Sequence, residues 1–174
     1  MTEYDGRLLD GITHLRASIG LLPVSQIGVW VRDQNRAVNL WESLFGMGPF
    51  QVHDFEPDEH WYLEIPSPLK MRLAKAPWGA VELEIIQPLM GNCIHRDRLQ
   101  CYGEGLGHLG FKVANYEKTF EDFLRGGFVC LETAETFYPP YDGTVKAAYF
   151  DTRRIGGVVF QIIWRSWEFV TEGT

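Results

Sequence analysis

At 174 residues, of which 45% are hydrophobic, the chain has the size and apolar content of one ordinary globular domain. Its 23 acidic residues outnumber the 16 Lys and Arg residues, and the resulting net charge of -7 disfavours a nucleic-acid partner. No apolar run approaches the roughly 18 residues of a membrane span, and charges interrupt the first residues, which argues against a membrane segment and a signal peptide.

The three cysteines also limit the class of protein. Cys93, Cys101 and Cys130 are odd in number and show neither a CxxC motif nor the Cys/His spacing of a zinc finger. This pattern argues against a disulfide framework and against structural zinc. We therefore expect a soluble, cytoplasmic protein.

The first half of the chain predicts a β-α-β-β-β unit. Residues 24–33 (VSQIGVWVRD) are rich in β-branched and aromatic side chains, which is typical of a buried strand. Residues 35–46 (NRAVNLWESLFG) place apolar side chains at helical spacing, and Gly46 lies where a helix C-cap glycine is expected. Three strands should follow, at 49–55, 69–76 and 80–88, with the turn PWG joining the last two.

The second half repeats this order after a polar connector, MGNCIHRDRLQCYGEG. A strand is expected at 108–115 and a helix at 116–127, again ending in glycine. Strands are then expected at 128–135, 145–152 and 157–164, with a loop, AETFYPPYDG, before the second of these. Repeated order within one chain predicts two modules whose sheets pair over a shared face.

The expected domain boundaries follow from this repeat. Residues 1–22 form an N-terminal extension that includes a short predicted helix, GITHLRASIG, suited to packing or a dimer contact. Residues 23–167 form one domain made of two modules, 23–90 and 106–167, and residues 168–174 form a tail.

Three motifs in the right order carry a resemblance to a known superfamily. They are VELEIIQPLMG at the end of the first module, GLGHLGFKV at the start of the second, and YFDTRRIGGVVFQII at its end. With them, the chain resembles the vicinal oxygen chelate superfamily, which includes lactoylglutathione lyase, methylmalonyl-CoA epimerase, extradiol dioxygenases and bleomycin-resistance proteins. The motifs are most similar to the glyoxalase and epimerase-like branch. The resemblance implies an α+β fold in which two βαβββ modules form a cup-shaped mixed sheet, and it implies a homodimer.

The resemblance also implies a divalent metal ion inside the cup. The four ligand positions of the family fall on Gln26, Glu84, His108 and Gln161. A carboxylate, an imidazole and two amide oxygens suit Zn, Ni, Co, Fe, Mn or Mg, and the sequence does not select among these ions. Only Glu84 is anionic, which should weaken metal binding, and ordinary structural roles for these residues leave a metal-free cup open as an alternative.

Several positions depart from the enzymes of the superfamily. Gln161 stands where proton-transfer members have their general base, and an amide cannot accept a proton near neutral pH. Arg72 stands near the place of the second carboxylate of epimerases, and Trp30 replaces the arginine that binds glutathione in lactoylglutathione lyases. A single matched histidine, His108, also disfavours an extradiol dioxygenase.

A base must therefore come from elsewhere. His53 is our first candidate, because its apolar neighbours should move its pKa, and Asp54, His60 and Glu82 are the others. Arg72 is the candidate for holding a carboxylate or enolate. We expect aromatic side chains to line the cup, and the candidate substrate-binding residues are Trp30, Tyr62 and Tyr149.

Two functions remain from the sequence. The first is a metal-dependent isomerase or lyase that acts through an enolate-like intermediate on an apolar or aromatic small molecule. The alternative is a metal-free small-molecule binding or resistance protein of the bleomycin-resistance type. Both predict a small-molecule ligand, and neither predicts a nucleic-acid or membrane partner.

Overall fold

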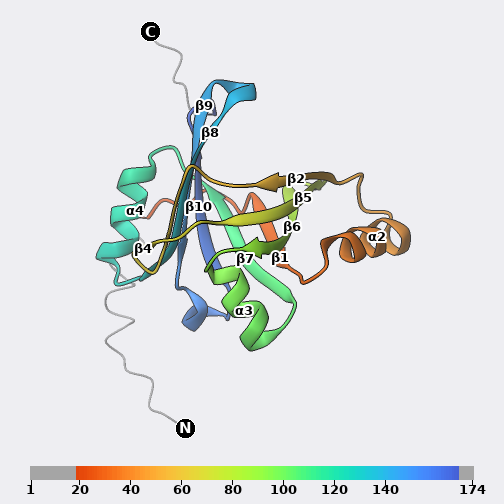
Figure 1. The fold of residues 1–174 in the computed structure, drawn as a ribbon. Helices are drawn as coiled ribbons and strands as arrows, with labels where there is room; N and C mark the ends of the chain where they lie inside the picture. Colours follow the sequence, from red (N-terminus) through yellow and green to blue (C-terminus); the bar gives the residue numbers. More distant parts are fainter. Residues whose placement is uncertain (1–18, 169–174) are drawn as a thin grey trace.

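The computed structural model describes residues 19–168, and its centre is a mixed sheet of ten strands that curls into an open half-barrel (Figure 1). The strand order is β2-β5-β6-β1-β7-β10-β9-β8-β3-β4. The expected α+β cup is therefore confirmed. The predicted helix GITHLRASIG lies almost entirely outside the described residues, and the boundaries of the extension and the tail stay predictions.

Two short strands join the halves of the sheet. β1 (Gln26–Trp30) is antiparallel to β7 (Gly105–Lys112), the first strand of the second half. Each of them runs parallel to the last strand of its own half, β1 to β6 (Val81–Met90) and β7 to β10 (Val159–Arg165). The four strands expected to carry the metal ligands are thus adjacent in the middle of the sheet.

The outer strands complete the predicted modules. In the first half, β5 (Lys70–Trp78) pairs with β6 and with β2 (Gln51–Phe55). In the second half, β9 (Gly143–Phe150) pairs with β10 and with β8 (Cys130–Tyr138). The predicted β-α-β-β-β order of both halves is confirmed.

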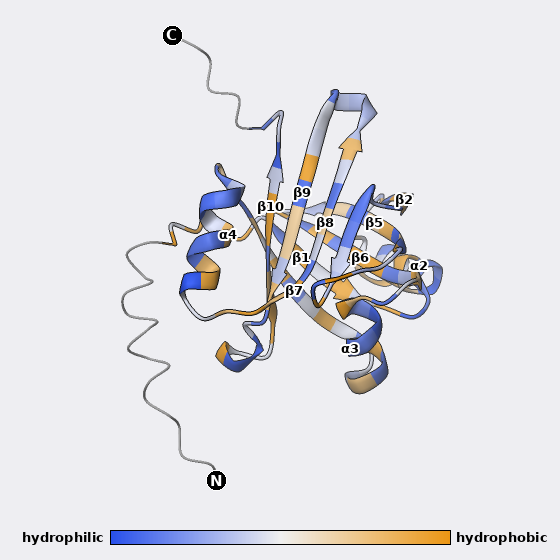
Figure 2. Cartoon of the chain, turned by 60° about the vertical axis from the view of Figure 1, so that its left-hand side comes forward, coloured by the Kyte–Doolittle hydropathy of each residue, from blue (hydrophilic) through white to orange (hydrophobic). Residues whose placement is uncertain are grey.

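Helices α2 (Gln34–Phe45) and α4 (Tyr116–Arg125) cover the convex face of the sheet. Their N-caps are Asp33 and Asn115, whose side chains accept hydrogen bonds from backbone N–H groups of the first turn, as N-cap residues do. Gly46 ends α2 with a φ of 65°, the left-handed conformation that glycine adopts without strain. In the hydropathy colouring, α4 alternates hydrophilic and hydrophobic segments, as expected for a helix with one face on the sheet (Figure 2).

A hairpin that the sequence did not predict crosses between the halves. β3 (Glu59–Tyr62) and β4 (Ile65–Pro66) follow β2 in the chain, but β3 pairs with β8 of the second half. The turn between them holds Leu63 and Glu64 at positive φ, where glycine would be expected, so the turn carries no sequence signal. The hairpin extends the sheet beyond β8 and brings His60 to the second half.

Two further expectations were wrong in detail. The polar connector holds a helix, α3 (Ile94–Tyr102), which has no side-chain cap at Cys93 and only weak amphipathic character. The expected loop AETFYPPYDG is mostly strand, because β8 continues to Tyr138 and pairs with Gly143, leaving a short 3-10 turn, η1 (Pro139–Tyr141). A second 3-10 turn, η2 (Arg153–Ile155), precedes β10.

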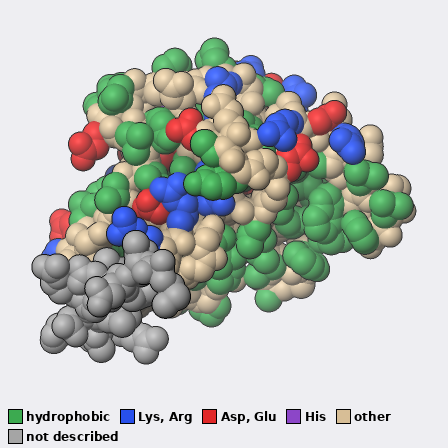
Figure 3. Space-filling view, turned by 90° about the horizontal axis from the view of Figure 1, so that it is seen from below, with side chains coloured by type: hydrophobic (Ala, Val, Ile, Leu, Met, Phe, Trp, Pro, Cys, Tyr) green, Lys and Arg blue, Asp and Glu red, His purple; other side chains and the backbone are tan. Residues whose placement is uncertain are grey.

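Large hydrophobic side chains are exposed at several places among residues 19–168, and some of them lie on α2. Seen from below, hydrophobic side chains cover much of the right-hand part of the surface, the side on which α2 lies in Figure 1, and others lie at the upper left (Figure 3). On α2, Leu40, Leu44 and Phe45 are exposed.

Among residues 19–168, no helix is long and apolar enough to cross a membrane. The three cysteines, all described, are free thiols.

Candidate active site

A cavity of about 320 Å³ lies in the concave face of the sheet, a volume suited to a small molecule. Side chains alternate across a strand, so every second residue of the cup strands points into it. The lining includes Met71, Leu73 and Lys75 of β5, Glu82, Glu84 and Ile86 of β6, Ala147 and Tyr149 of β9, and Gln161 and Ile163 of β10.

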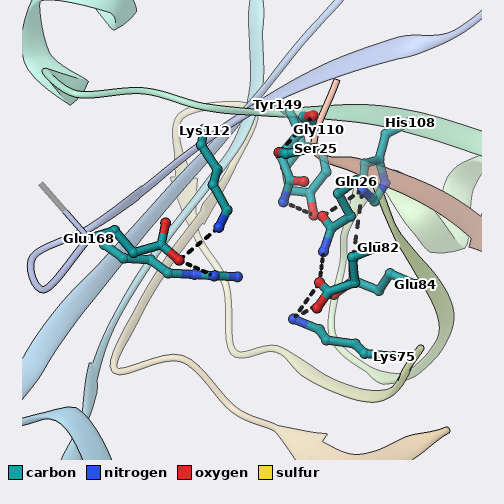
Figure 4. A network of polar contacts seen from close by, with 12 residues as sticks. Ser25, Gln26, Lys75, Glu82, Glu84, His108, Gly110, Lys112, Tyr149 and Glu168 are labelled. Atoms are coloured by element: carbon teal, nitrogen blue, oxygen red, sulfur yellow. Dashed lines mark hydrogen bonds and ion pairs between the residues drawn. The ribbon is translucent and has the colours of Figure 1, made fainter. Parts of the chain in front are cut away.

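Three of the four expected metal ligands converge at the base of this cavity. The Nε2 atom of His108 lies 3.3 Å from Oε1 of Gln26 and 3.6 Å from Oε2 of Glu84. All three side chains are at least 95% buried, and they come from β7, β1 and β6. Figure 4 shows them turned toward one another. An imidazole nitrogen and two oxygens therefore share one small, buried volume.

Gln161, the fourth expected ligand, reaches the same region from β10. Its Nε2 atom donates to the Tyr149 hydroxyl at 2.7 Å, which leaves its Oε1 atom buried with no hydrogen-bond partner among residues 19–168. A Cβ atom added to Gly110 would lie 3.1 Å from this Oε1 atom and 3.2 Å from Oε1 of Gln26. The amide oxygens of Gln26 and Gln161 therefore both lie close to the same position over Gly110 of β7.

Two glycines make room for the buried rings beneath the cavity. A Cβ atom on Gly28 would lie 1.9 Å from Cε1 of His108, and a Cβ atom on Gly107 would lie 2.1 Å from Cε2 of Trp30. The imidazole therefore lies flat across β1, and the indole lies across β7. Gly28 and Gly107 are therefore required by this close approach rather than by a turn.

Substituting Gly28 by alanine should displace His108. We expect Gly28→Ala to reduce the free energy of unfolding by about 1–3 kcal/mol, because the ring cannot stay where it is and the surrounding core is closely packed. Urea denaturation of both proteins measures the difference. Gly20→Ala is the matched control, since its added methyl group meets nothing within 4 Å. Equal stability of Gly28→Ala and wild type would contradict the position of the ring.

Lys75 is a site residue that the sequence analysis missed. Its Nζ atom lies 3.0 Å from Oε1 of Glu84 and 3.9 Å from Oε1 of Glu82. Burial alone would lower the pKa of Lys75, but the two carboxylates outweigh burial and raise the pKa, so the ammonium group is charged near neutral pH. Glu82 also accepts a hydrogen bond from Nε2 of Gln26 at 2.7 Å, which turns the Gln26 Oε1 atom toward His108. The sequence did offer a signal for Lys75, because it lies two residues after Leu73 and four after Met71 and therefore shares their buried face of β5.

The contact between Trp30 and His108 sets the proton position on the imidazole. The indole N–H of Trp30 donates to Nδ1 of His108 at 3.3 Å, and an indole nitrogen can only donate. Nδ1 is therefore unprotonated, and the imidazole proton lies on Nε2, facing Gln26 and Glu84. Burial, with help from His95 and Lys75, lowers the pKa of His108 well below its ordinary value, so the ring is neutral.

Three expected site residues lie away from the cavity. Trp30 was expected on the cup wall, but it is 2% exposed and packs behind His108 in the core. Tyr62 is in the β3–β4 hairpin and donates to Oδ2 of Asp97. Arg72 points out of the other face of β5 and pairs with Asp54, with Nε 2.9 Å from Oδ1. The period-2 alternation of β5, read together with Leu73, would have placed Arg72 correctly.

His53 and Tyr149 do line the cavity, as expected. Burial, followed by the charge of Lys75, lowers the pKa of His53, so its imidazole is neutral near pH 7. Tyr149 is buried beside Gln161 and His108. Of the other three candidate bases, only Glu82 lines the cavity. Asp54 pairs with Arg72 outside the cavity, and His60 lies beside Glu132 in a separate group of buried residues.

Comparison with known proteins agrees with this architecture. The family model of the Glyoxalase/Bleomycin resistance protein/Dioxygenase superfamily matches residues 25–149. The chain belongs to this superfamily. The match spans the cup strands β1, β6 and β7 that supply Gln26, Glu84 and His108. No curated protein sequence matches the chain.

Solved structures of the superfamily share the fold. A variant of Streptomyces coelicolor methylmalonyl-CoA epimerase in complex with 2-nitronate-propionyl-CoA aligns with a TM-score of 0.59 at 16% identity, covering 83% of this chain and 98% of that one. The Mycobacterium tuberculosis epimerase aligns with a TM-score of 0.57 at 16% identity, covering 83% and 88%. A mutant of S. coelicolor 4-hydroxymandelate synthase gives 0.53 at 15% identity, covering 82% and 48%. At these identities, the likeness concerns the fold.

The converging residues suit a divalent ion by donor type and position. Imidazole, carboxylate and amide oxygens are accepted ligands of borderline divalent ions, and the Glu84 oxygen that faces His108 is not the one paired with Lys75. The unpartnered Oε1 atom of Gln161 adds a fourth donor. Two features oppose binding, namely the positive charge of Lys75 and the proton that Trp30 holds on Nε2 of His108. Both features are tested below.

Proposed function

We propose that the chain is a metal-dependent enzyme of the superfamily, an isomerase or lyase that moves a proton beside a substrate carbonyl through an enolate-like intermediate. The observation that supports this proposal is the convergence of His108, Glu84 and Gln26 in a buried position at the base of a cavity. A divalent ion held by these residues and Gln161 would supply a Lewis acid that polarises a substrate oxygen and stabilises its developing negative charge.

The chain's own groups would share the remaining tasks. His53 is the proposed base, because it lines the cavity and its lowered pKa keeps the imidazole free to accept a proton at pH 7. Lys75 adds a fixed positive charge beside Glu84, where negative charge would develop on the substrate. Gln161 cannot take the proton, and its hydrogen bond to the Tyr149 hydroxyl fixes both side chains instead.

The cavity indicates a small ligand with an apolar or aromatic body. Tyr138, Tyr141 and Trp167 all line it, and their rings stack with centroid separations of 4.6–6.1 Å. Such a rim favours a flat ligand. We also propose a homodimer, supported by the exposed hydrophobic residues of α2.

Replacing Glu84 by glutamine tests the metal proposal. Glu84→Gln keeps the shape of the side chain but removes the only anionic ligand, so we expect the dissociation constant for zinc or cobalt to rise about tenfold or more. Equilibrium dialysis of chelator-stripped protein measures the constant. Glu56→Gln is the control, because Glu56 is a largely exposed carboxylate that pairs with Lys70 and does not line the cavity. An equal effect of both substitutions, or none from Glu84→Gln, would count against the proposal.

The aromatic rim supports one second candidate, a metal-free binding protein. In that case, Glu84→Gln should leave the affinity for an aromatic carboxylic acid unchanged, and the ligand should bind equally well to chelator-treated protein. A chelator that abolishes ligand binding would exclude this candidate.

A further inference from the structure

A second group of metal-binding side chains lies apart from the four residues of the cup. Cys93 and His95 are at the start of α3, and Glu132 is on β8. One ligand atom from each lies within 4.8 Å of the others, and all three side chains are buried. The sequence analysis argued against structural zinc from the spacing of the cysteines and did not consider His95 or Glu132. The signal it passed over is the Cys-x-His of NCIHRD.

Several polar atoms of this group lack hydrogen-bond partners in the part of the chain that the structure describes. Oε2 of Glu132 accepts the backbone N–H of Ile94 at 2.7 Å, which turns Oε1 toward Nδ1 of His95, 3.6 Å away. Within residues 19–168, Oε1 of Glu132 and both ring nitrogens of His95 have no hydrogen-bond partner. His95 is 0% exposed and Glu132 is 1% exposed. Leaving such groups unsatisfied costs about 1–3 kcal/mol each, and more for a charged group, so something should satisfy them.

His60 of the crossing hairpin also lies beside Glu132. Its Nδ1 atom lies 2.7 Å from the carbonyl oxygen of Ser67, and a carbonyl only accepts, so Nδ1 carries a proton. The Nε2 atom then faces Oε1 of Glu132 at 3.4 Å and also has no hydrogen-bond partner in the described chain. An imidazole anchored through its far N–H, with its bare nitrogen directed at a carboxylate, is the second-shell pattern of metal-ligating histidines.

A proton alone would not satisfy the whole group. Although burial lowers the pKa of His60, the hydrogen bond and charge of Glu132 outweigh burial and raise it, so a protonated His60 could pair with the carboxylate. That pairing would leave both ring nitrogens of His95 without hydrogen-bond partners among residues 19–168.

We propose that Cys93, His95 and Glu132, with His60 as the fourth ligand, bind a transition-metal ion of the zinc class. A thiolate, two imidazoles and a carboxylate oxygen form a four-coordinate donor set for zinc or cobalt. Binding transfers the thiol proton of Cys93 to solvent and forms the metal–sulfur bond. Because Glu132 lines the cavity from β8, the ion would lie in the cavity wall. This inference does not depend on metal binding by the cup residues.

Cobalt absorption distinguishes the two sites, since the cup cluster contains no cysteine. Chelator-stripped full-length protein is titrated with Co²⁺, and we expect a near-ultraviolet thiolate-to-cobalt charge-transfer band that saturates at about one equivalent. His108→Ala should keep the band, whereas Cys93→Ser should lose it. Circular dichroism verifies that each variant is folded. Failure of the cup proposal alone would leave this band intact.

A second variant tests whether the Glu132 carboxylate is a ligand while leaving the Cys93 thiol unchanged. Glu132→Gln keeps its length and should weaken cobalt binding at this site about tenfold or more. Two results would overturn the inference. One is cobalt binding to the wild type without a thiolate band, and the other is a band that persists in Cys93→Ser, which would assign it to Cys101 or Cys130.

Discussion

Replacing Lys75 by methionine is expected to tighten divalent-metal binding in the cup by about tenfold or more. The ammonium group lies 3.0 Å from Oε1 of Glu84, and its charge repels any cation held by the other oxygen of that carboxylate. Methionine keeps most of the length and the apolar stem of the side chain. The same change should destabilise the metal-free protein, because Glu84 then loses its buried counter-ion.

Isothermal titration with zinc and thermal unfolding with and without metal measure both parts of this prediction. The matched control is Lys112→Met, because Lys112 pairs with Glu168 at 2.8 Å, away from the cluster (Figure 4). The control should alter zinc affinity by less than about threefold. Weaker zinc binding in Lys75→Met would show that this lysine supports the site rather than competing with the ion.

Trp30→Phe is expected to raise metal affinity by about fivefold to tenfold. Removing the indole N–H frees Nδ1 of His108 to carry the proton, and Nε2 can then face a cation with its lone pair. The substitution also removes buried volume beside His95 and should reduce the free energy of unfolding by about 1–3 kcal/mol.

Competition with a fluorescent zinc chelator measures the affinity in this experiment. Trp41→Phe is the control, since Trp41 is an aromatic residue packed between α2 and the sheet with no contact to His108. Unchanged or reduced affinity in Trp30→Phe would mean that the indole does not hold the imidazole proton on Nε2.

The cup and its central residues could be predicted because their signals are local. The strand QIGVW is read from its β-branched and aromatic side chains and VELEII from a period-2 pattern. The resemblance to the superfamily places Gln26, Glu84 and His108 on strands that prove adjacent. The alternation also put Glu82 and Glu84 on one face. Their convergence in the structure is the strongest agreement between sequence and fold.

The remaining features depend on contacts that a linear pattern does not carry. The β3–β4 hairpin pairs with a strand about 70 residues later, so nothing near His60 indicates that it approaches Glu132. Trp30 is on the same face of β1 as Gln26, as alternation predicts, but it packs in the core behind His108 and does not reach the cavity. The sequence analysis did not consider Lys75, whose partners Glu82 and Glu84 lie on the neighbouring strand β6.

Anomalous X-ray diffraction from crystals of the full chain grown with cobalt would test the central claim most directly. The account predicts an anomalous peak within bonding distance of Nε2 of His108 and Oε2 of Glu84, with an amide oxygen of Gln26 or Gln161 completing the site. A map with no peak there under saturating cobalt, or with a peak only beside Cys93, His95 and Glu132, would contradict a metal-dependent cup.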